Sequence, residues 1–364
     1  MRRYIIGLPH FGVDPAMNDF VALAGQQQTL ARAIIQRRDT EREVMTRLIT
    51  EYRAIVRCLS RAGARLQVGI QVALTDWGVL GPLRQDFDLE LFEFNLRLPL
   101  NRTCYPRDIC LRLKNETVVN SDLKGDLEQS VDWRFVPQGR RPIFAPLGEG
   151  GTTLASTRSV ITQERLVGPG GVSIELGDRA FDVVREAGLA LVKIPLFRST
   201  CLGSIGEEQE DAGLSVNNHL DRVAALVTDA AGRDHLIVDP TIEAARFETP
   251  HPTRDFEPVG VKTWGPMLKA RAAQAGVNLH MATEQMGVPY ALNLLQLENG
   301  NVVMTSGCKA TRRQVEEIVG KGRVYATDVP IQYYPTHLRA GLRCLIGDAP
   351  PKALHTRWRR PFST

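Results

Sequence analysis

Four short polar stretches carry residue types that could do chemistry together. They read YPRD at 105–108, GEGG at 148–151, NNHLD at 217–221 and RAGLRC at 339–344. Between them they contain a thiol, an imidazole, carboxylates and guanidinium groups, which are the groups used in nucleophilic and general acid–base catalysis. They lie far apart in the chain, so they form one site only if the fold brings them together.

The last two stretches hold the residues best suited to bond making and proton transfer. Cys344 is the candidate nucleophile, because a thiolate that forms beside positive charge is a strong one. His219 titrates near neutrality and can carry protons to and from a reacting group. Glu149 in the second stretch could orient that imidazole and keep it basic.

The remaining acids suit a cationic, planar ligand. Asp108 and Asp221 have no metal-ligand cluster beside them, and each carboxylate can accept paired N–H bonds from a guanidinium. Arg339 could hold a carboxylate at the other end of the same molecule. His219 and Asp221 are two residues apart, which on a strand would place both side chains on one face and turn Leu220 to the core.

Each stretch also has an ordinary structural interpretation. A cysteine in an apolar run usually belongs to the core, and neighbouring Arg and Asp residues usually form weak surface ion pairs. GEGG is usually a turn and lacks the Lys-Ser/Thr of a phosphate-binding loop. His235 and His280 lie in strand-like runs and look structural. The order and placement of the four stretches, more than any one of them, favour a shared site.

Composition narrows the class of protein. The 364 residues include 45 basic and 41 acidic ones, a balance that gives no reason to expect nucleic acid or an anionic membrane as partner. The opening apolar run is too short for a signal peptide, and no stretch has the roughly 18 apolar residues of a membrane helix. No two of the six cysteines have CxxC spacing, so we expect a reduced, cytoplasmic protein: Cys58, Cys104, Cys110, Cys201, Cys308 and Cys344.

A helix, a glycine and a strand recur along the chain. Apolar residues with a 3.6-residue period predict a helix at 38–61, part of a long N-terminal helix within about 27–62. Gly63 is a plausible left-handed cap, and the strand ARLQVGIQV follows it. The same order returns at 181–195, 267–282 and 311–330.

Hairpins precede the later helices. The run 291–307 has two apolar segments joined by Asn299-Gly300, a strong hairpin signal, and 223–240 has the same form around Gly232. Weaker versions occur at 109–122 and 152–163. A hairpin–helix–strand unit repeated four or five times favours a ring of units whose strand starts converge on one axis, over an ordinary α/β domain with accidental similarity.

The ordered motifs resemble those of the guanidine-modifying enzymes, the arginine deiminase and amidinotransferase superfamily with the pentein fold. The family pattern is aromatic-x-Arg-Asp, Glu-Gly-Gly, His-x-Asp and a glycine-rich loop ending in Arg-Cys, here YPRD, EGG, HLD and RAGLRC. The resemblance covers about 97–348. It implies an α/β propeller, a pseudo-fivefold ring of ββαβ units around a central active site, and we expect residues 1–364 to form a single domain of this type.

The resemblance also implies a role for each catalytic residue. Cys344 would be the nucleophile, with His219 as general acid and base and Glu149 paired to it. Asp108 and Asp221 would hold the guanidinium beside the sulfur.

Substrate contacts follow from the same motifs. Asp108, Asp221, Arg107 and Arg339 would bind the substrate, and Arg339 matches the arginine that grips the α-carboxylate in arginine deiminases. The chain departs from the family in having Thr152 where Asp often follows Glu-Gly-Gly, and its cysteine loop has fewer glycines. Both departures concern the identity of the substrate more than the chemistry.

The expected activity is hydrolysis of the guanidino group of arginine or a close derivative. A covalent Cys344 amidino-thioether would form, ammonia and a ureido product would be released, and neither metal nor organic cofactor would be needed. The only partner expected is this small molecule, with a homo-oligomer possible. Either of the glycine-rich segments 167–178 and 201–213 could form a lid over the site.

Three alternatives share part of this pattern. An amidinotransferase would use the same first half-reaction and replace water by an amine. A methylated or decarboxylated guanidine could be the substrate, although Arg339 argues against a decarboxylated one. A non-catalytic pentein, such as the ribosome anti-association factor, would bind through its surface and would not need the matching Cys, His and Asp residues.

Overall fold

A computed structural model describes most of the expected elements. The residues that it describes are 3–7, 41–70, 77–93, 106–114, 116–120, 143–145, 147, 150–167, 173–175, 178–194, 220–240, 246–250, 258–283, 291–331 and 341–348. Its strands form five sheets of similar topology and two additional strand pairs. Four of the five sheets have three strands, in which a hairpin is followed by a third strand parallel to its second.

The first two of these sheets come from the middle of the chain. One follows the short helix α5 (Pro106–Ile109) and contains β4 (Cys110–Leu113), β5 (Glu116–Asn120) and β6 (Ile143–Ala145). The other contains β7 (Thr153–Ala155), β8 (Ser159–Gln163) and β11 (Ala190–Ile194), with η4 (Asp178–Phe181) and α7 (Asp182–Glu186) before its last strand. A separate strand pair, β9 (Arg165–Val167) and β10 (Ser173–Glu175), lies between β8 and η4 in the chain.

The next two sheets repeat the unit with a longer helix. The third contains β12 (Ala224–Thr228), β13 (Asp234–Val238), α9 (Trp264–Gln274) and β16 (Asn278–Met281), and follows the 3-10 turn η7 (Leu220–Arg222). A strand pair, β14 (Arg246–Pro250) and β15 (Pro258–Thr263), precedes α9. The fourth contains β17 (Leu295–Gln296), β18 (Val302–Met304), α10 (Lys309–Val319) and β19 (Val324–Ala326).

The fifth sheet joins the two ends of the chain. Its order is β20-β1-β2-β3, and its strands are β20 (Ile346–Asp348), β1 (Arg3–Gly7), β2 (Arg65–Ile70) and β3 (Glu90–Glu93). β20 is antiparallel to β1, and β1 is parallel to β2, so the hairpin-like pair of this unit is formed by strands from opposite ends of the chain. The helices α3 (Glu41–Arg61) and α4 (Trp77–Asp86) precede β2 and β3.

Sequence patterns explain why these elements form. The predicted hairpins are present, and their turns contain Gly232 and Gly300 at φ of +78° and +81°, a conformation that L residues rarely adopt. The amphipathic helix expected at 38–61 is observed as α3, and Gly63 follows it with φ of +79°. The part of the expected helix before Glu41 lies outside the described residues.

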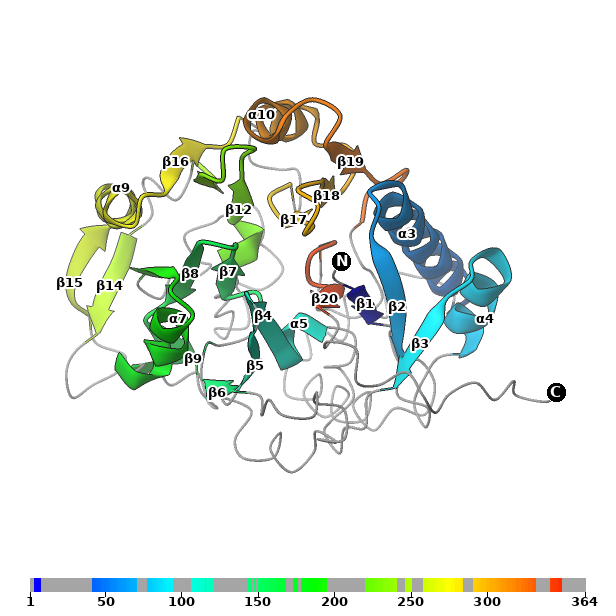
Figure 1. Ribbon diagram of the computed structural model, residues 1–364, viewed down its shortest axis with the longest axis horizontal. Helices are drawn as coiled ribbons and strands as arrows, with labels where there is room; N and C mark the ends of the chain where they lie inside the picture. Colours follow the sequence, from blue (N-terminus) through cyan, green and yellow to red (C-terminus); the bar gives the residue numbers. More distant parts are fainter. Residues whose placement is uncertain are drawn as a thin grey trace.

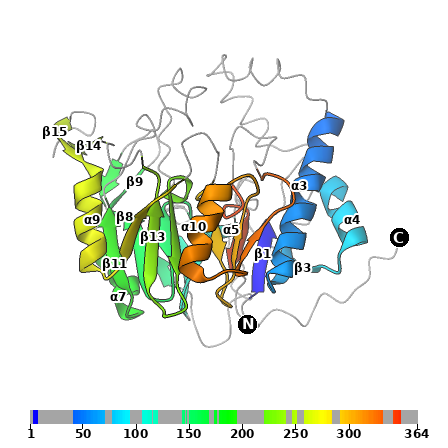
Figure 2. The same ribbon diagram turned by 90° about the horizontal axis from the view of Figure 1, so that it is seen from above.

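Apolar faces of helices pack on the sheets. α3 buries Tyr52, Ile55 and Leu59 in the same core cluster as Ile6 and Val68 of β1 and β2. The Tyr52 hydroxyl donates a hydrogen bond of 2.6 Å to the carbonyl of Gly7, which ties the helix to the strand. Figures 1 and 2 show α9, α10 and α3 following one another along the outer side of the sheets.

Neighbouring sheets are joined near their hairpins. The Gln296 side chain accepts the Thr228 N–H at 2.7 Å and donates to the Thr228 carbonyl at 2.8 Å, linking the third sheet to the fourth. In the described part of the chain, the strands form separate small mixed sheets and no closed barrel. None of the described helices combines the length and hydropathy that crossing a membrane requires.

Candidate functional site

Each of the five sheets is preceded by polar or glycine residues at similar positions. These residues lie two or three positions before the first strand of the sheet: Arg107 and Asp108 before β4, Gly150 and Gly151 before β7, Asp221 before β12, Asn293 before β17, and Arg343 and Cys344 before β20. Four of these positions belong to the four stretches singled out in the sequence. Their contacts show that the stretches do meet.

Arg343 connects three of the stretches. Its guanidinium forms an ion pair of 2.7 Å between Nη1 and Asp221 Oδ2, with 5% of the Arg343 side chain and none of the Asp221 side chain exposed. The same group donates to the carbonyls of Gly150 at 3.0 Å and Thr153 at 2.7 Å. The backbone N–H of Asp221 in turn donates to the Gly151 carbonyl at 3.0 Å.

Arg107 brings the YPRD stretch to the same place. A Cβ on Gly150 would lie 2.3 Å from Arg107 Cγ, so only glycine fits there without movement of the arginine. Arg107 Nε donates to the Ile346 carbonyl at 3.1 Å, while Nη2 is buried and has no hydrogen-bond partner in the described part of the chain. Burial lowers the pKa of Arg107, and the nearby charge of Arg343 lowers it further.

Cys344 lies at the partly exposed edge of this cluster. Its Sγ accepts a hydrogen bond from Asn293 Nδ2 at 3.2 Å and lies 3.6 Å from Asp221 Oδ2. The cysteine packs against the core formed around α3 without being buried in it. A thiol that is accessible and also held by polar groups differs from the inert core cysteine considered above.

The two carboxylate oxygens of Asp221 differ in their hydrogen bonding. Oδ2 is shared between Arg343 and the Cys344 sulfur, whereas Oδ1 is buried without a hydrogen-bond partner among the described residues. A buried acceptor without a donor is costly. Oδ1 of Asp221 can therefore accept one further donor beside the thiol, such as a water molecule or an N–H group of a ligand.

The prediction of a strand through His219 and Asp221 is wrong at Leu220 and Asp221. Residues Leu220–Arg222 form the 3-10 turn η7, because the Val223 N–H bonds to the Leu220 carbonyl and the Asp221 N–H is taken by Gly151. Leu220 is buried in the core, as expected. The alternation of side chains along a strand therefore gives no basis for placing the side chains of His219 and Asp221 on one face.

Several expected site residues cannot be located. His219, Glu149 and Arg339 lie outside the described residues, as does the proposed lid segment 201–213. Of the other proposed lid, 167–178, only the ends and 173–175 are described. The backbone of Asp108 lies in α5. The structure thus places the Cys344, Asp221 and Arg107 side chains of the expected set.

Two residues of the cluster were not identified from the sequence. Asn293 is fully buried and touches both Cys344 and Asp221, and Arg343 holds Asp221. The signal for Asn293 was an asparagine inside the apolar run ALNLLQL, within the predicted hairpin at 291–307; the first strand of this hairpin, β17, begins two residues after it. It occupies in the fourth sheet the position that Asp108 and Cys344 occupy in theirs.

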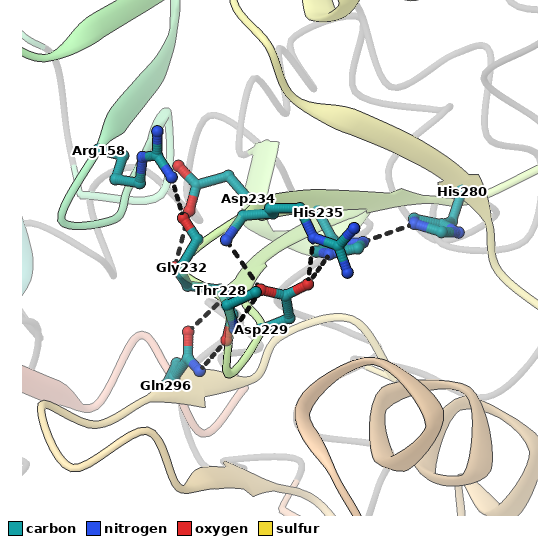
Figure 3. Close-up of polar contacts among 10 residues, drawn as sticks. Arg158, Thr228, Asp229, Gly232, Asp234, His235, His280 and Gln296 are labelled. Atoms are coloured by element: carbon teal, nitrogen blue, oxygen red, sulfur yellow. Dashed lines mark hydrogen bonds and ion pairs between the residues drawn. The ribbon is translucent and has the colours of Figure 1, made fainter.

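A second polar cluster lies at the far end of strand β12, at the turn of the β12–β13 hairpin (Figure 3). Asp229 accepts the backbone N–H groups of Ala231 and Arg233, the Arg233 Nε and the His235 ring. These hydrogen bonds, led by that from the Arg233 backbone, hold the pKa of Asp229 well below its usual range.

His235 and His280 extend this cluster across the sheet (Figure 3). His235 Nδ1 and His280 Nε2 are 2.9 Å apart, and the other His235 nitrogen is 3.2 Å from Asp229 Oδ2. Because a carboxylate only accepts, neutral His235 carries its proton toward Asp229 and accepts from His280. Burial lowers the pKa of His280, and His235 lowers it further. Within the described residues no group of His, Cys, Asp and Glu has the arrangement of a metal site.

Comparison with solved structures identifies the fold. No protein-family model and no curated protein matches the chain. AgrE, solved as a ternary complex with ornithine and NAD+, matches with a TM-score of 0.50 and 11% identity, over 96% of this chain and 39% of that one. The fold is that of the guanidine-modifying, or pentein, enzymes. This confirms at the level of the fold the resemblance suggested by the motifs.

Two further solved structures are similar to the chain. DDAH from Pseudomonas aeruginosa, a mutant complexed with citrulline, has a TM-score of 0.46 and 13% identity over 82% of this chain and 86% of that one. The N-terminal domain of ArgZ, an arginine dihydrolase from the ornithine-ammonia cycle in Cyanobacteria, has a TM-score of 0.43 and 11% identity over 75% and 85%.

Proposed function

We propose that the chain hydrolyses the guanidino group of arginine or a close arginine derivative through a covalent intermediate on Cys344. The observation that carries this proposal is the pairing of an accessible thiol with a buried acid. The Cys344 sulfur lies 3.6 Å from Asp221 Oδ2, and Asp221 Oδ1 has no hydrogen-bond partner in the described part of the chain. A cation held at Oδ1 would lie next to the nucleophile.

Arg343 supports a guanidinium as that cation. The chain's own guanidinium already binds Asp221 from one side through Oδ2 at 2.7 Å, so the site tolerates this group in a buried setting. A substrate guanidinium would take Oδ1 on the other side and place its central carbon toward the sulfur. Charge balance favours this arrangement, because the substrate's cation offsets the charge of the thiolate that attacks it.

The reaction consists of two additions and two eliminations. Cys344 Sγ forms a bond to the central guanidino carbon, and the bond from that carbon to a terminal nitrogen breaks as ammonia leaves with a proton from His219. Water then adds to the amidino-thioether after giving a proton to His219, the C–S bond breaks, and the ureido product departs. Positioning of the cation next to the sulfur contributes much of the acceleration.

The remaining roles are carried over from the motifs. Glu149 would keep the His219 imidazole basic, Asp108 would hold the guanidinium from the side opposite Asp221, and Arg339 would bind the α-carboxylate of an amino acid substrate. The buried Arg107 would contribute to substrate binding from behind the site, with its Nε donating to the carbonyl of Ile346, two residues after Cys344.

We also propose that the five sheets form a pseudo-fivefold ring in one domain, with this site at its axis. The equivalent positions of Asp108, Gly150, Asp221, Asn293 and Cys344 before their sheets support that arrangement. A reduced cytoplasmic setting suits the free thiols of Cys58, Cys308 and Cys344.

The test is a panel of guanidines incubated with the full chain while ammonia and ureido products are measured. Arginine alone should yield ammonia and citrulline, and Cys344→Ala should abolish turnover while the variant stays folded. Cys308→Ala, which alters a buried cysteine away from the cluster, is the matched control and should retain turnover. A requirement for an added amine would indicate an amidinotransferase instead. Consumption of no guanidine, or full activity of Cys344→Ala, would refute the proposal.

A further inference from the structure

Asn293 occupies the centre of the cluster and uses its whole side-chain amide. Its Oδ1 accepts the backbone N–H of Arg343 at 2.7 Å and that of Cys344 at 3.4 Å. Its Nδ2 donates to the Cys344 sulfur at 3.2 Å and to the Asp221 backbone carbonyl at 3.2 Å. Only this orientation of the amide works, because the flipped one would oppose NH2 to two backbone N–H donors.

We propose that Asn293 is the positioning residue of the nucleophile: it holds the cysteine loop through Oδ1 and donates to the reactive sulfur through Nδ2. This inference rests on the proposed function for the identity of the reaction. The contact of Asn293 with the sulfur does not depend on that function. The donor stabilises the thiolate more than the thiol, because a hydrogen bond to a charged acceptor is the stronger one. The acceptor fixes the direction from which the sulfur reaches a substrate.

The packing around Asn293 supports a dedicated role. The side chain is fully buried, and a Cβ on Gly341 would lie 2.3 Å from its Oδ1 and 2.4 Å from its Cγ. The glycine in RAGLRC therefore admits the amide to the loop. Among the cysteines whose burial is described, the one that Asn293 contacts is also the one that is partly exposed.

The pseudo-symmetry of the sheets gives a second, independent line of support. Asn293 lies two residues before β17, which is the position of Cys344 before β20 and of Gly151 before β7. Asn293 is the polar residue that the fourth sheet contributes to the cluster at this position. The fourth unit thus contributes the residue that supports the nucleophile of the fifth.

The experiment measures alkylation of each cysteine by iodoacetamide in the native chain, using peptide mass spectrometry and no substrate. Asn293→Asp keeps Oδ1 as an acceptor and replaces the donor to sulfur by a negatively charged oxygen. Alkylation of Cys344 should slow by about tenfold or more near neutral pH, because the sulfur loses its donor and gains a negative neighbour. Asn301→Asp is the matched control: Asn301 lies in the same hairpin and donates to the Ala62 carbonyl instead.

Buried cysteines report whether a variant has merely unfolded. Burial raises the pKa of Cys58 to about 11, and Cys308 is buried as well, so neither should react while the fold is intact. If Asn293→Asp exposes them, the uncharged Asn293→Leu, which is similar in shape and has no side-chain donor, replaces it and the same ratio of Cys344 alkylation rates decides. Parent-like alkylation of Cys344 in a folded donor-free variant would overturn the proposal.

Turnover separates this inference from the function on which it rests. With an active parent, Asn293→Asp should lower kcat at least tenfold and leave KM within a factor of about two, because the amide contacts the sulfur and the loop. If the parent consumes no guanidine, the proposed function fails while the alkylation rates still test Asn293. If KM rises and kcat stays, Asn293 binds substrate and the positioning role is wrong.

Discussion

The two ends of strand β12 carry polar clusters of similar composition and different character. Before the strand, Asp221 pairs with Arg343, with 0% and 5% of their side chains exposed, and one carboxylate oxygen lacks a partner in the described part of the chain. After the strand, Asp229 pairs with Arg233, whose side chain is 67% exposed, and local N–H groups surround the carboxylate. Each cluster thus contains an aspartate that is paired with an arginine.

The difference lies in where the partners come from. Asp229 is satisfied by residues within six positions of it, which is how a hairpin turn is stabilised. Asp221 is held by Arg343 and Gly151, from two other sheets, and approaches a partly exposed thiol. Incomplete satisfaction where distant segments converge is what the proposed ligand site requires, whereas complete local satisfaction is typical of a structural turn.

The largest expected effect comes from removing the arginine of each pair. Arg343→Met leaves Asp221 as an uncompensated buried charge and should lower the free energy of unfolding by about 3–5 kcal/mol. Arg233→Met should cost less than about 1 kcal/mol, because the pair is exposed on one side and Asp229 keeps its other donors. Urea unfolding of both variants measures the difference, and equal losses would remove the distinction drawn here.

A glycine-to-alanine pair separates stability from activity. Gly341→Ala forces its Cβ against Asn293 and should cost about 1–3 kcal/mol and lower kcat/KM about 100-fold, through displacement of the cysteine loop. Gly232→Ala, at φ of +78° in the hairpin turn, should cost a similar 1–2 kcal/mol or so and leave kcat/KM unchanged. Equal activities in the two variants would show that the loop around Gly341 does not position the nucleophile.

The smallest expected effect is a pH dependence from the second cluster. The pKa of His280 is lower in the folded chain than its ordinary value of 6.5. At pH values near and below 6.5, His280 therefore binds fewer protons in the folded chain than in the unfolded chain. His280 therefore destabilises the fold progressively as pH falls through that value, and has no such effect well above it. In His280→Gln, which retains a donor for His235, the free energy of unfolding should decline less between about pH 7.5 and about pH 5.5. An unchanged decline would contradict the assignment.

Local sequence pattern was sufficient for most of the elements. The period of α3, the Asn299-Gly300 and Gly232 turns, and the repeated hairpin–helix–strand order were all recognisable because they depend on neighbours within a few residues. The same local reasoning was wrong at Leu220 and Asp221, where a bond from Asp221 N–H to the distant Gly151 carbonyl accompanies a 3-10 turn instead of a strand. The rule that side chains alternate along a strand considers only neighbouring residues, so it does not include a hydrogen bond to a distant residue such as Gly151.

The candidate site was predictable in part. The ordered motifs pointed to Cys344, Asp221 and Arg107, and the structure places all three in one cluster. Asn293 belongs to none of the four motifs, and Arg343 lies in the Arg-Cys motif without an assigned role; the contacts of both depend on which carbonyl, sulfur or carboxylate the fold places beside them. Residue type alone did not indicate those contacts.

The chain's own sequence was enough to establish which units form, where their glycine turns fall and which thiol, acids and cations are available, because short-range sterics and apolar periodicity govern these. Tertiary structure decided that Arg343 engages one oxygen of Asp221 while the other has no hydrogen-bond partner among the described residues, and that a buried amide before the fourth sheet donates to the sulfur before the fifth. These outcomes depend on contacts between residues 122 and 51 positions apart, whose geometry is set only when the sheets pack together.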